Sequence, residues 1–449
     1  MSCHRIVFLI DNKRRDLMVA GVIGRHLEEK GHKVFYEPLE ATFAVLAAYR
    51  PDVIVFNHLS ASHLVAYSRR LHDLGVIVAV LPNEGVAYQK ESQDFLALKG
   101  YANAWIDIYF CWNRPLSEAV KRNDAGGAIQ APVVGVPRFD LYFEPFVSHW
   151  RKTCAWLDTT RPNVLVCTNY ALAKYHTLPV EEADKLFRSW ADSITWMKDY
   201  RGCIAVQYRN RERLFSFLQA LAISERYNVI LRPHPNEEAD WYVRRLAEMP
   251  DRLGSRIRLA VNENITQLIV NCDLEISMDS CTTAMESWIA GKPTIDLPME
   301  SHEILTKAAV QGLNTTCDDP SALPDMVASA LINPVSEELC LKRAAHLETW
   351  CSSPDGTSSL RVATFLNDVA DRRGEIDYAD RLTLDDRRKA LKLKILRAFG
   401  LPYNWQPQLA LRGFFDPKGT FIKRRIHAKT MTPKDERAMR ALVSKIYAN

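Results

Sequence analysis

The feature that most constrains the fold is a repeated alternation of short apolar runs with helical patterns. In the first 140 residues the runs, which are rich in valine and isoleucine, are RIVFLI (5–10), HKVFYE (32–37), DVIVFN (52–57), VIVAVL (76–81), IDIYFC (106–111) and APVVGV (131–136). One helical pattern follows the first run and ends near Glu29, and two more lie near 40–49 and 61–74. Strands that are apolar on both faces are typical of a parallel sheet covered by helices on each side. This part of the chain is therefore predicted to form a Rossmann-like α/β domain.

A second series of the same kind begins near residue 163. Its apolar runs are NVLVCT (163–168), YNVILR (227–232), RIRLAV (256–261), CDLEIS (272–277) and KPTIDL (292–297). Helices are expected in a long region that ends near residue 223, and over about 302–311, 320–333, 336–350 and 358–371. We predict an α/β protein with two Rossmann-like domains, 1–140 and 163–372, that face a central cleft. A crossover at 141–162 joins them, and an extension at 373–449 follows.

The composition is that of an ordinary soluble globular protein. The chain has 449 residues, of which 47% are hydrophobic and 25% are charged. No run reaches eighteen apolar residues, and the first apolar run is too short for a signal peptide. The ten cysteines show neither CxxC pairs nor metal-ligand spacing. We therefore expect reduced cysteines in a cytoplasmic protein.

Positive charge is concentrated in the C-terminal extension. From Arg387 onward the chain has 16 Lys and Arg against 3 Asp and Glu, whereas the preceding residues have 42 against 51. The segment RRKALKLKILRAFGL (387–401) places leucines and a phenylalanine among the cations, and three phenylalanines stand among more cations over 412–429. We expect residues 387–429 to bind an anionic membrane surface at the inner face of the membrane. The alternative is that these helices pack back on the acidic body. A nucleic acid partner is not expected, because no reading module is recognisable.

A hydroxyl-rich segment follows the predicted strand 272–277 and begins a predicted helix: SMDSCTTAMESWIAGKP (277–293). Unpaired N–H groups at a helix start, together with the helix dipole, favour a phosphate group. Ser280, Thr282 and Thr283 would add hydroxyl donors, and Glu286 would accept from ribose hydroxyls. The structural alternative is a capping box, in which Thr283 is the N-cap residue and Glu286 bonds back to it.

Two prolines flank the candidate donors in RPHP (232–235), directly after the predicted strand 227–232. Each proline disfavours the helical conformation for the residue before it, so Arg232 and His234 are both held extended. We predict that Arg232 gives bidentate donors to a phosphate and that His234 stabilises a leaving phosphate. The alternative for His234 is a turn histidine bonded to its own backbone.

In the first domain, LPNEGVAY (81–88) follows the predicted strand 76–81 and presents Glu84 in a tight turn. Its carboxylate would serve as a general base or nucleophile, and the alternative is a solvated turn carboxylate. Asn83, His58 and Arg138 are candidates for lining the same site. For Arg138 the alternative is that it pins the crossover together with Asp140.

Several common cofactor motifs are missing. The sequence has no GxxxxGK[ST] loop and no GxGxxG after the first strand, which argues against nucleoside triphosphatases and NAD enzymes. No DxD-like motif stands at a strand end, and histidines and cysteines are scattered. We therefore predict chemistry without a metal ion and without a cofactor.

Four stretches, in this order, resemble the bacterial surface carbohydrate biosynthesis proteins: LPNEGVAY, VVGVPRFDLY, ILRPHPNEEADW and SCTTAMESWIAGKPTI, within about residues 5–370. These are GT-B-type glycosyltransferases allied to capsule and lipopolysaccharide ulosonic acid (Kdo-like) transferases. The His-Pro pair is similar to that of bacterial sialyltransferases that use CMP-sugars. This resemblance implies that His234 contacts the CMP phosphate and that Thr282 and Thr283 hold it. The segment Asn83-Glu84-Gly85 is similar to their acidic-acidic-Gly motif and implies Glu84 as the catalytic base, with Asn83 in place of the first acid.

The sequence thus predicts a metal-independent GT-B glycosyltransferase. It would move a sugar, with an ulosonic acid from a CMP donor favoured, onto a lipid-linked surface glycan. Two other functions stay open. A polyol-phosphate transferase with a CDP-linked donor would need the same phosphate site, and a non-catalytic protein of the same fold would keep the cleft.

Overall fold

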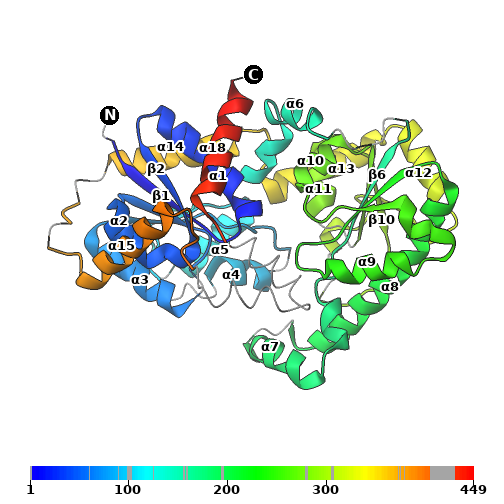
Figure 1. Ribbon diagram of the computed structural model, residues 1–449, viewed down its shortest axis with the longest axis horizontal. Helices are drawn as coiled ribbons and strands as arrows, with labels where there is room; N and C mark the ends of the chain where they lie inside the picture. The colour runs from blue at the N-terminus through cyan, green and yellow to red at the C-terminus, as the bar shows by residue number, and fades with distance from the viewer. Residues whose placement is uncertain are drawn as a thin grey trace. The chain divides into compact units, whose positions relative to one another are not determined.

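The computed structural model describes residues 3–59, 61–88, 90–98, 104–124, 126–154, 157, 160–193, 197–278, 282–304, 308–372, 374, 376–378, 380–404 and 430–448. The chain divides into two compact units (Figure 1). Unit 1 consists of residues 1–146 and 345–449, and unit 2 of residues 147–344. Each unit contains one sheet in which all the strand pairs are parallel. The predicted α/β fold class, with two Rossmann-like domains, is confirmed.

The sheet of unit 1 has the strand order β2-β1-β3-β4-β5. Its strands are β1 (Arg5–Ile10), β2 (Lys33–Pro38), β3 (Val53–Phe56), β4 (Ile77–Val80) and β5 (Ile108–Tyr109). The helices of this unit are α1 (Lys13–Glu29), α2 (Thr42–Tyr49), α3 (Ser62–Leu74), α4 (Lys90–Leu98), α5 (Arg114–Asn123), α14 (Ser358–Asp371), α15 (Leu384–Ala398) and α18 (Pro433–Tyr447). Every residue of β3 and β4 is buried, as the continuous apolar runs predicted.

The sheet of unit 2 has the strand order β11-β10-β9-β6-β7-β8. Its strands are β6 (Asn163–Cys167), β7 (Asn228–Arg232), β8 (Ile257–Leu259), β9 (Leu274–Met278), β10 (Thr294–Leu297) and β11 (Thr315–Thr316). The helices are α7 (Val180–Ser193), α8 (Tyr200–Ser224), α9 (Ala239–Ala247), α10 (Ile265–Asn271), α11 (Thr282–Ile289) and α12 (Leu323–Ile332). Helices α6 (Phe146–Arg151) and α13 (Glu337–Cys351) lie where the chain passes from one unit to the other.

Two predicted elements differ from the structure. The strand expected at 131–136 is reduced to single bridges, from Gln130 to Ile108 and from Val133 to Cys111. Pro132 has no N–H to donate, which limits regular pairing there. The helix expected at 302–311 is, in the residues described, a turn at 303–304 and a 3-10 helix at Ala308–Val310. The side chain of His302 accepts from the N–H of Ile304 (3.2 Å) and so competes with helical bonding.

Helix α14 has the predicted bounds. It belongs to unit 1, whereas the predicted second domain, 163–372, includes it. It packs on α1 and on the 3-10 helix Pro137–Tyr142. The buried carboxylate of Asp140 accepts from the N–H groups of Ser358 (3.0 Å) and Ser359 (2.6 Å) in the first turn of α14. Asp140 thus satisfies N–H groups that a helix start leaves unpaired, and it binds α14 to unit 1.

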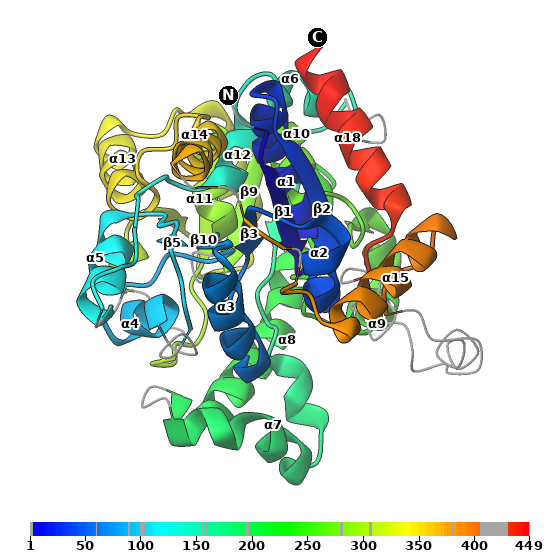
Figure 2. The same ribbon diagram turned by 90° about the vertical axis from the view of Figure 1, so that its left-hand side faces the viewer.

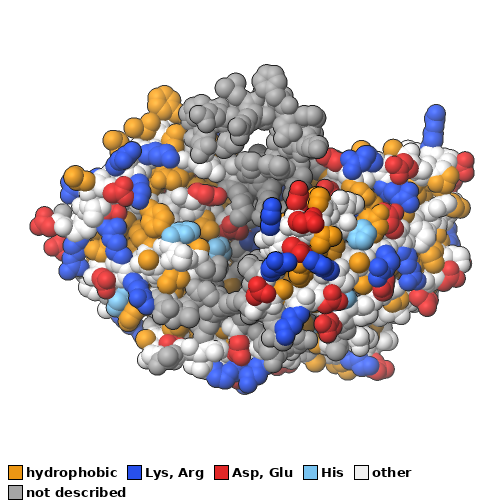
Figure 3. All heavy atoms as spheres, turned by 90° about the horizontal axis from the view of Figure 1, so that it is seen from below, with side chains coloured by type: hydrophobic (Ala, Val, Ile, Leu, Met, Phe, Trp, Pro, Cys, Tyr) orange, Lys and Arg blue, Asp and Glu red, His pale blue; other side chains and the backbone are white. Residues whose placement is uncertain are grey.

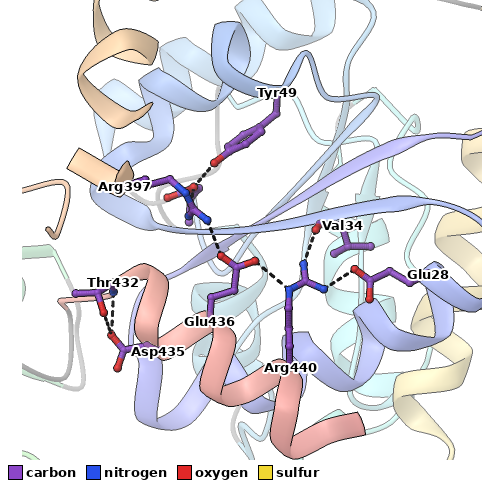
Figure 4. Close-up of polar contacts among 9 residues, drawn as sticks. Glu28, Val34, Tyr49, Arg397, Thr432, Asp435, Glu436 and Arg440 are labelled. Carbon is purple, nitrogen blue, oxygen red and sulfur yellow. Dashed lines mark hydrogen bonds and ion pairs between the residues drawn. The ribbon is translucent and has the colours of Figure 1, made fainter. Parts of the chain in front are cut away.

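The described helices of the C-terminal extension also pack on unit 1, α15 on α2 and α18 on α1 (Figures 1 and 2). Ion pairs reinforce these contacts, as Figure 4 shows. Arg397 of α15 donates to Glu37 (2.6 Å) and to Glu436 of α18 (2.7 Å), and Arg440 donates to Glu436 (3.0 Å) and Glu28 (2.6 Å). One side of α15 therefore packs on the body, while α18 lies outside the predicted membrane segment 387–429. Residues 405–429 of the predicted membrane segment lie outside the described residues.

Candidate active site

A pocket opens at the carboxyl ends of β1, β3 and β4 in unit 1. Its cavity volume is about 40 Å³. Its wall combines apolar side chains with polar and charged ones from six segments of the chain: Phe8, Leu9, Ile10, Arg15, Asp16, Val19, Ala20, Val55, Asn57, Leu81, Pro82, Asn83, Trp112, Pro137 and Arg138. In open α/β sheets, ligands bind at this edge of the strands.

Asp16 is a pocket residue that the sequence analysis missed. Helix α1 begins after Asn12, and Asp16 stands in its first turn with 5% of its surface exposed. One carboxylate oxygen, Oδ1, accepts from Nε of Arg15 (2.7 Å), while Oδ2 accepts from the N–H of Asn12 (2.9 Å) and from Nδ2 of Asn83 (3.3 Å). Burial raises the pKa of Asp16, although Arg15 acts in the opposite direction. Asp16 therefore joins the helix start to the loop that carries Asn83.

The loop LPNEG (81–85) is held firmly against the rest of unit 1. Nε1 of Trp112 donates to the carbonyl of Pro82 (3.1 Å), and Nδ2 of Asn113 donates to the carbonyl of Gly85 (2.9 Å). A Cβ atom at Gly85 would lie 2.5 Å from Trp112, so this close approach requires glycine. The loop therefore gives Asn83 and Glu84 fixed backbone positions.

Glu84 lies beside the pocket, and its side chain is exposed. Burial would lower the pKa of Arg15, but the negative charges of Asp16, Glu84 and Asp11 outweigh this effect and raise it. The carboxylate of Glu84 is therefore close enough to interact with a guanidinium of the pocket wall. It differs from Asp16 in being open to solvent.

The other predicted residues of unit 1 separate in the structure. Asn83 and Arg138 line the pocket, and the Arg138 guanidinium carbon lies 5.3 Å from the ring centre of Trp112. His58 is half-buried and does not belong to the described pocket wall, whereas its neighbour Asn57 does and donates to Asn83 (3.2 Å). The alternative for Arg138 is that it pins the crossover together with Asp140. In the structure Arg138 lines the pocket, whereas Asp140 is hydrogen-bonded to the start of α14.

In unit 2, His234 lies in a tight turn after β7. Its ring Nδ1 accepts from the N–H of Asn236 (3.1 Å), so a neutral ring carries its proton on Nε2. This is the bonding that the turn-histidine alternative predicted. The same bond fixes the orientation of the ring. A ligand contact through Nε2 would also need a fixed ring orientation.

A buried carboxylate, Glu237, holds this turn in place, and the sequence analysis missed it as well. One oxygen accepts from the hydroxyl of Thr168 (2.6 Å) and from the N–H of His234 (3.0 Å), while the other accepts from the hydroxyl of Tyr242. Burial raises the pKa of Glu237, and the bonds from Thr168 and Tyr242 oppose that rise. Glu237 thus connects the ends of β6 and β7 with α9.

Arg232 is extended, as the prolines predicted, but its guanidinium has structural partners. Its Nη1 donates to the carbonyls of Ala260 (3.1 Å) and Val261 (2.6 Å), at the end of β8. This side chain therefore fastens the end of β7 to the end of β8.

Helix α11 begins at Thr282, and Ser280 lies outside the described residues. Thr283 stands inside the first turn, so the capping-box interpretation, which made Thr283 the N-cap residue, is wrong. Its hydroxyl donates instead to Oε1 of Glu275 on β9 (3.0 Å). Burial, with the neighbouring Asp296 and Glu286, raises the pKa of Glu275 to about 8, against the effect of the Thr283 bond. Glu286 itself is buried on α11.

Over the part of the chain that the structure describes, no three or more His, Cys, Asp and Glu side chains gather where they could hold a metal ion. Among the same residues, no helix is long and apolar enough to cross a membrane.

No family model matches the chain, and no curated protein matches its sequence. Solved structures with a similar chain architecture include HepE from Anabaena in complex with UDP and glucose, with 14% identity over 81% of this chain and 99% of that chain and a TM-score of 0.43. The wall teichoic acid polymerase TagF has 10% identity over 82% and 89%, with a TM-score of 0.48. The spinosyn rhamnosyltransferase SpnG has 14% identity over 80% and 100%, with a TM-score of 0.41.

Proposed function

We propose that the protein is a metal-independent glycosyltransferase. It would transfer a sugar from a CMP-linked donor onto a lipid-linked surface polysaccharide, and the resemblance of RPHP to sialyltransferase segments favours an ulosonic acid as that sugar. The observation that carries the proposal is the pocket of unit 1. Its wall holds carboxylate, guanidinium, amide and indole groups at the edge of a parallel sheet, and these groups suit a sugar with many hydroxyls.

In this proposal Glu84 is the general base of the transfer. Its carboxylate takes the proton of an acceptor hydroxyl, and the hydroxyl oxygen forms a bond to the anomeric carbon of the donor sugar. The bond between that carbon and the phosphate oxygen breaks, and CMP leaves with the electron pair. Glu84 suits this role because its side chain is exposed to solvent.

Asp16 suits a positioning role in the same pocket. It is only 5% exposed, and its two carboxylate oxygens already accept from Arg15, Asn12 and Asn83, so its side chain is held in one orientation within the pocket wall. Asp16 would therefore hold Asn83 and Arg15 in place beside the acceptor.

Unit 2 would bind the donor nucleotide. The ring of His234, held through Nδ1, would donate from Nε2 to a phosphate oxygen as negative charge develops on the leaving group. The first turn of α11 would add N–H groups and the positive end of its dipole. Ser280, Thr282 and Thr283 stay the proposed hydroxyl donors to phosphate, with Arg232 behind them and Glu286 as the proposed ribose acceptor.

Calorimetric titration of the full chain with CMP, CDP and UDP tests the donor class. We expect CMP to bind most tightly, and His234→Ala to weaken CMP binding at least about tenfold. His63→Ala, which removes an exposed histidine from α3 of unit 1, is the control and should leave CMP binding unchanged. Preference for UDP would overturn the CMP donor.

Analysis of the product bond tests the reaction itself. A glycosidic bond and released CMP are the expected products. A phosphodiester bond would identify the polyol-phosphate transferase that the sequence left open. Nucleotide binding without any transfer, in the presence of a lipid-linked acceptor, would favour the non-catalytic alternative.

A further inference from the structure

One side of α15 is fixed to unit 1, which determines the side that is left exposed. Leu393 is buried beside Ala41 and Ala44, and Ala390 is buried as well. Near the start of the helix, Arg70 of α3 donates to both carboxylate oxygens of Asp386. Leu393 is one of the leucines of 387–401 from which a membrane-binding helix is predicted, but in the structure it belongs to the contact with α2.

The opposite side of α15 carries an exposed apolar stripe. Leu384, Leu391, Ile395 and Phe399 are 85%, 59%, 47% and 76% exposed, respectively. Their spacings of seven, four and four residues place them along one face of a helix that turns every 3.6 residues. Single exposed apolar residues are normal on a protein surface, but Leu391, Ile395 and Phe399 follow one another at four-residue spacing and form a patch, which Arg388 separates from Leu384.

Cations border this stripe. Arg387, Arg388, Lys392 and Lys394 are all exposed, and within the described ranges none of the four is in an ion pair. Lys392 lies over the ring of Tyr403, with its Nζ 4.6 Å from the ring centre. The acidic residues of the same helix are neutralised locally, Asp386 by Arg70 and Asp385 by Lys389 (2.6 Å). The exposed side of α15 therefore presents a net positive charge beside apolar side chains. On the face seen in Figure 3, hydrophobic, basic and acidic side chains are interspersed.

We propose that the exposed face of α15 binds an anionic lipid bilayer, with the helix lying in the plane of its surface. The apolar stripe would enter the boundary between headgroups and acyl chains, and the four cations would contact lipid phosphates. The positive charge of the patch favours an anionic bilayer over a second copy of the chain, because two copies of α15 would bring like charges together. The proposal holds for any function of the two sheets, since it concerns only a helix outside both candidate sites.

Flotation of the full-length protein with vesicles tests the proposal. Vesicles of phosphatidylcholine with about 30 mol% phosphatidylglycerol are expected to carry the protein upward at low salt, because anionic lipids attract basic surfaces. Vesicles of phosphatidylcholine alone are expected to leave it behind. Raising the salt should release it, because screening weakens attraction between charges.

Two kinds of variant separate the apolar and the charged contributions. The double change Leu391→Ser and Ile395→Ser removes the middle of the stripe, and we expect it to abolish flotation. The double change Arg388→Gln and Lys392→Gln should weaken binding about 30-fold, about fivefold for each cation near an anionic surface. All four side chains are exposed, so thermal unfolding should match that of the wild type.

Ile332→Ser is the matched control, since Ile332 is 81% exposed on α12 of unit 2 and lies outside the patch. It should float like the wild type. Equal binding of the stripe variant and the wild type would overturn the proposal, and so would equal binding to neutral vesicles. A dimer in solution that the stripe variant converts to a monomer, without vesicle binding, would assign the patch to a second copy of the chain.

Discussion

Glu237 offers a direct test of how the His234 turn is built. Its carboxylate is buried and accepts from three donors: the hydroxyls of Thr168 and Tyr242 and the N–H of His234. Replacing it with leucine keeps a side chain of similar size but removes every acceptor. Replacing it with glutamine keeps one acceptor oxygen, which can still serve Thr168 and His234.

The contacts set the size of the expected effect. A hydrogen bond to a charged group contributes about 1.5–3 kcal/mol, and a buried donor left without an acceptor costs about 1–3 kcal/mol. The three donors share one carboxylate, so their losses do not add fully. We therefore expect Glu237→Leu to lower the unfolding free energy of unit 2 by about 3–5 kcal/mol, and Glu237→Gln by about 1–2 kcal/mol.

Scanning calorimetry of the full chain measures the stability loss, and titration with CMP measures the consequence for the site. Because His234 loses its anchor, Glu237→Leu should also weaken CMP binding at least about tenfold at a temperature where the variant is folded. Glu248→Gln is the matched control. The carboxylate of Glu248 is 63% exposed and lies 3.5 Å from Arg245, so this change should cost less than about 0.5 kcal/mol. Stability and CMP affinity of Glu237→Leu equal to those of the control would refute the role of Glu237.

Three further predictions concern catalysis and stability. His234→Ala should reduce kcat/KM by an amount equivalent to about 2–4 kcal/mol in steady-state kinetics, the range for one lost preorganised donor; near-normal turnover would contradict its role. Glu84→Gln should abolish transfer yet leave nucleotide affinity intact by calorimetry, whereas Asp16→Asn should mainly raise the KM for the acceptor; equal losses of kcat would make Asp16 part of the proton transfer. Burial would raise the pKa of Asp386, but hydrogen bonds from Arg70 and Thr383 outweigh it and lower the pKa to about 2. This folded-state pKa lies below the ordinary value of 3.8. The ionised carboxylate therefore stabilises the protein by about 2 kcal/mol above pH 3.8, and this stabilisation is lost as the pH falls through 2. Asp386→Asn should remove this pH dependence in urea unfolding, and an unchanged profile would contradict the assignment.

The strands were the most predictable part of the fold. Buried parallel strands need continuous apolar runs, and β1 begins and ends where its run does. The run 131–136 has the same composition, but Pro132 interrupts its pairing. Strand β11 has only two residues, Thr315 and Thr316, and it could not be predicted because no apolar run includes them. An apolar run therefore forms a regular strand only where its own N–H groups can pair with the carbonyls of a neighbouring strand.

The partners of the helices were not predictable from periodicity. The apolar face of α14 shows that this helix packs on something, but not that its partner α1 lies more than 300 residues earlier. The same limit applies to single side chains. Asp16 reads as an ordinary acid in a first helical turn, and only the order of β1, β3 and β4 brings it to Asn83. For Arg232 the prolines predicted the backbone correctly, while the direction of the guanidinium depends on β8.

The path of the chain through the two units has a consequence for synthesis. Unit 2 is continuous, but unit 1 needs residues from both ends of the chain. A Cβ atom at Gly21 of α1 would lie 2.0 Å from Met439, so α18 packs tightly on a helix that leaves the ribosome more than 400 residues earlier. Domains usually fold in the order in which they are made. Here we expect the reverse, because the N-terminal sheet must wait for α14 and α18 while unit 2 already has all of its residues.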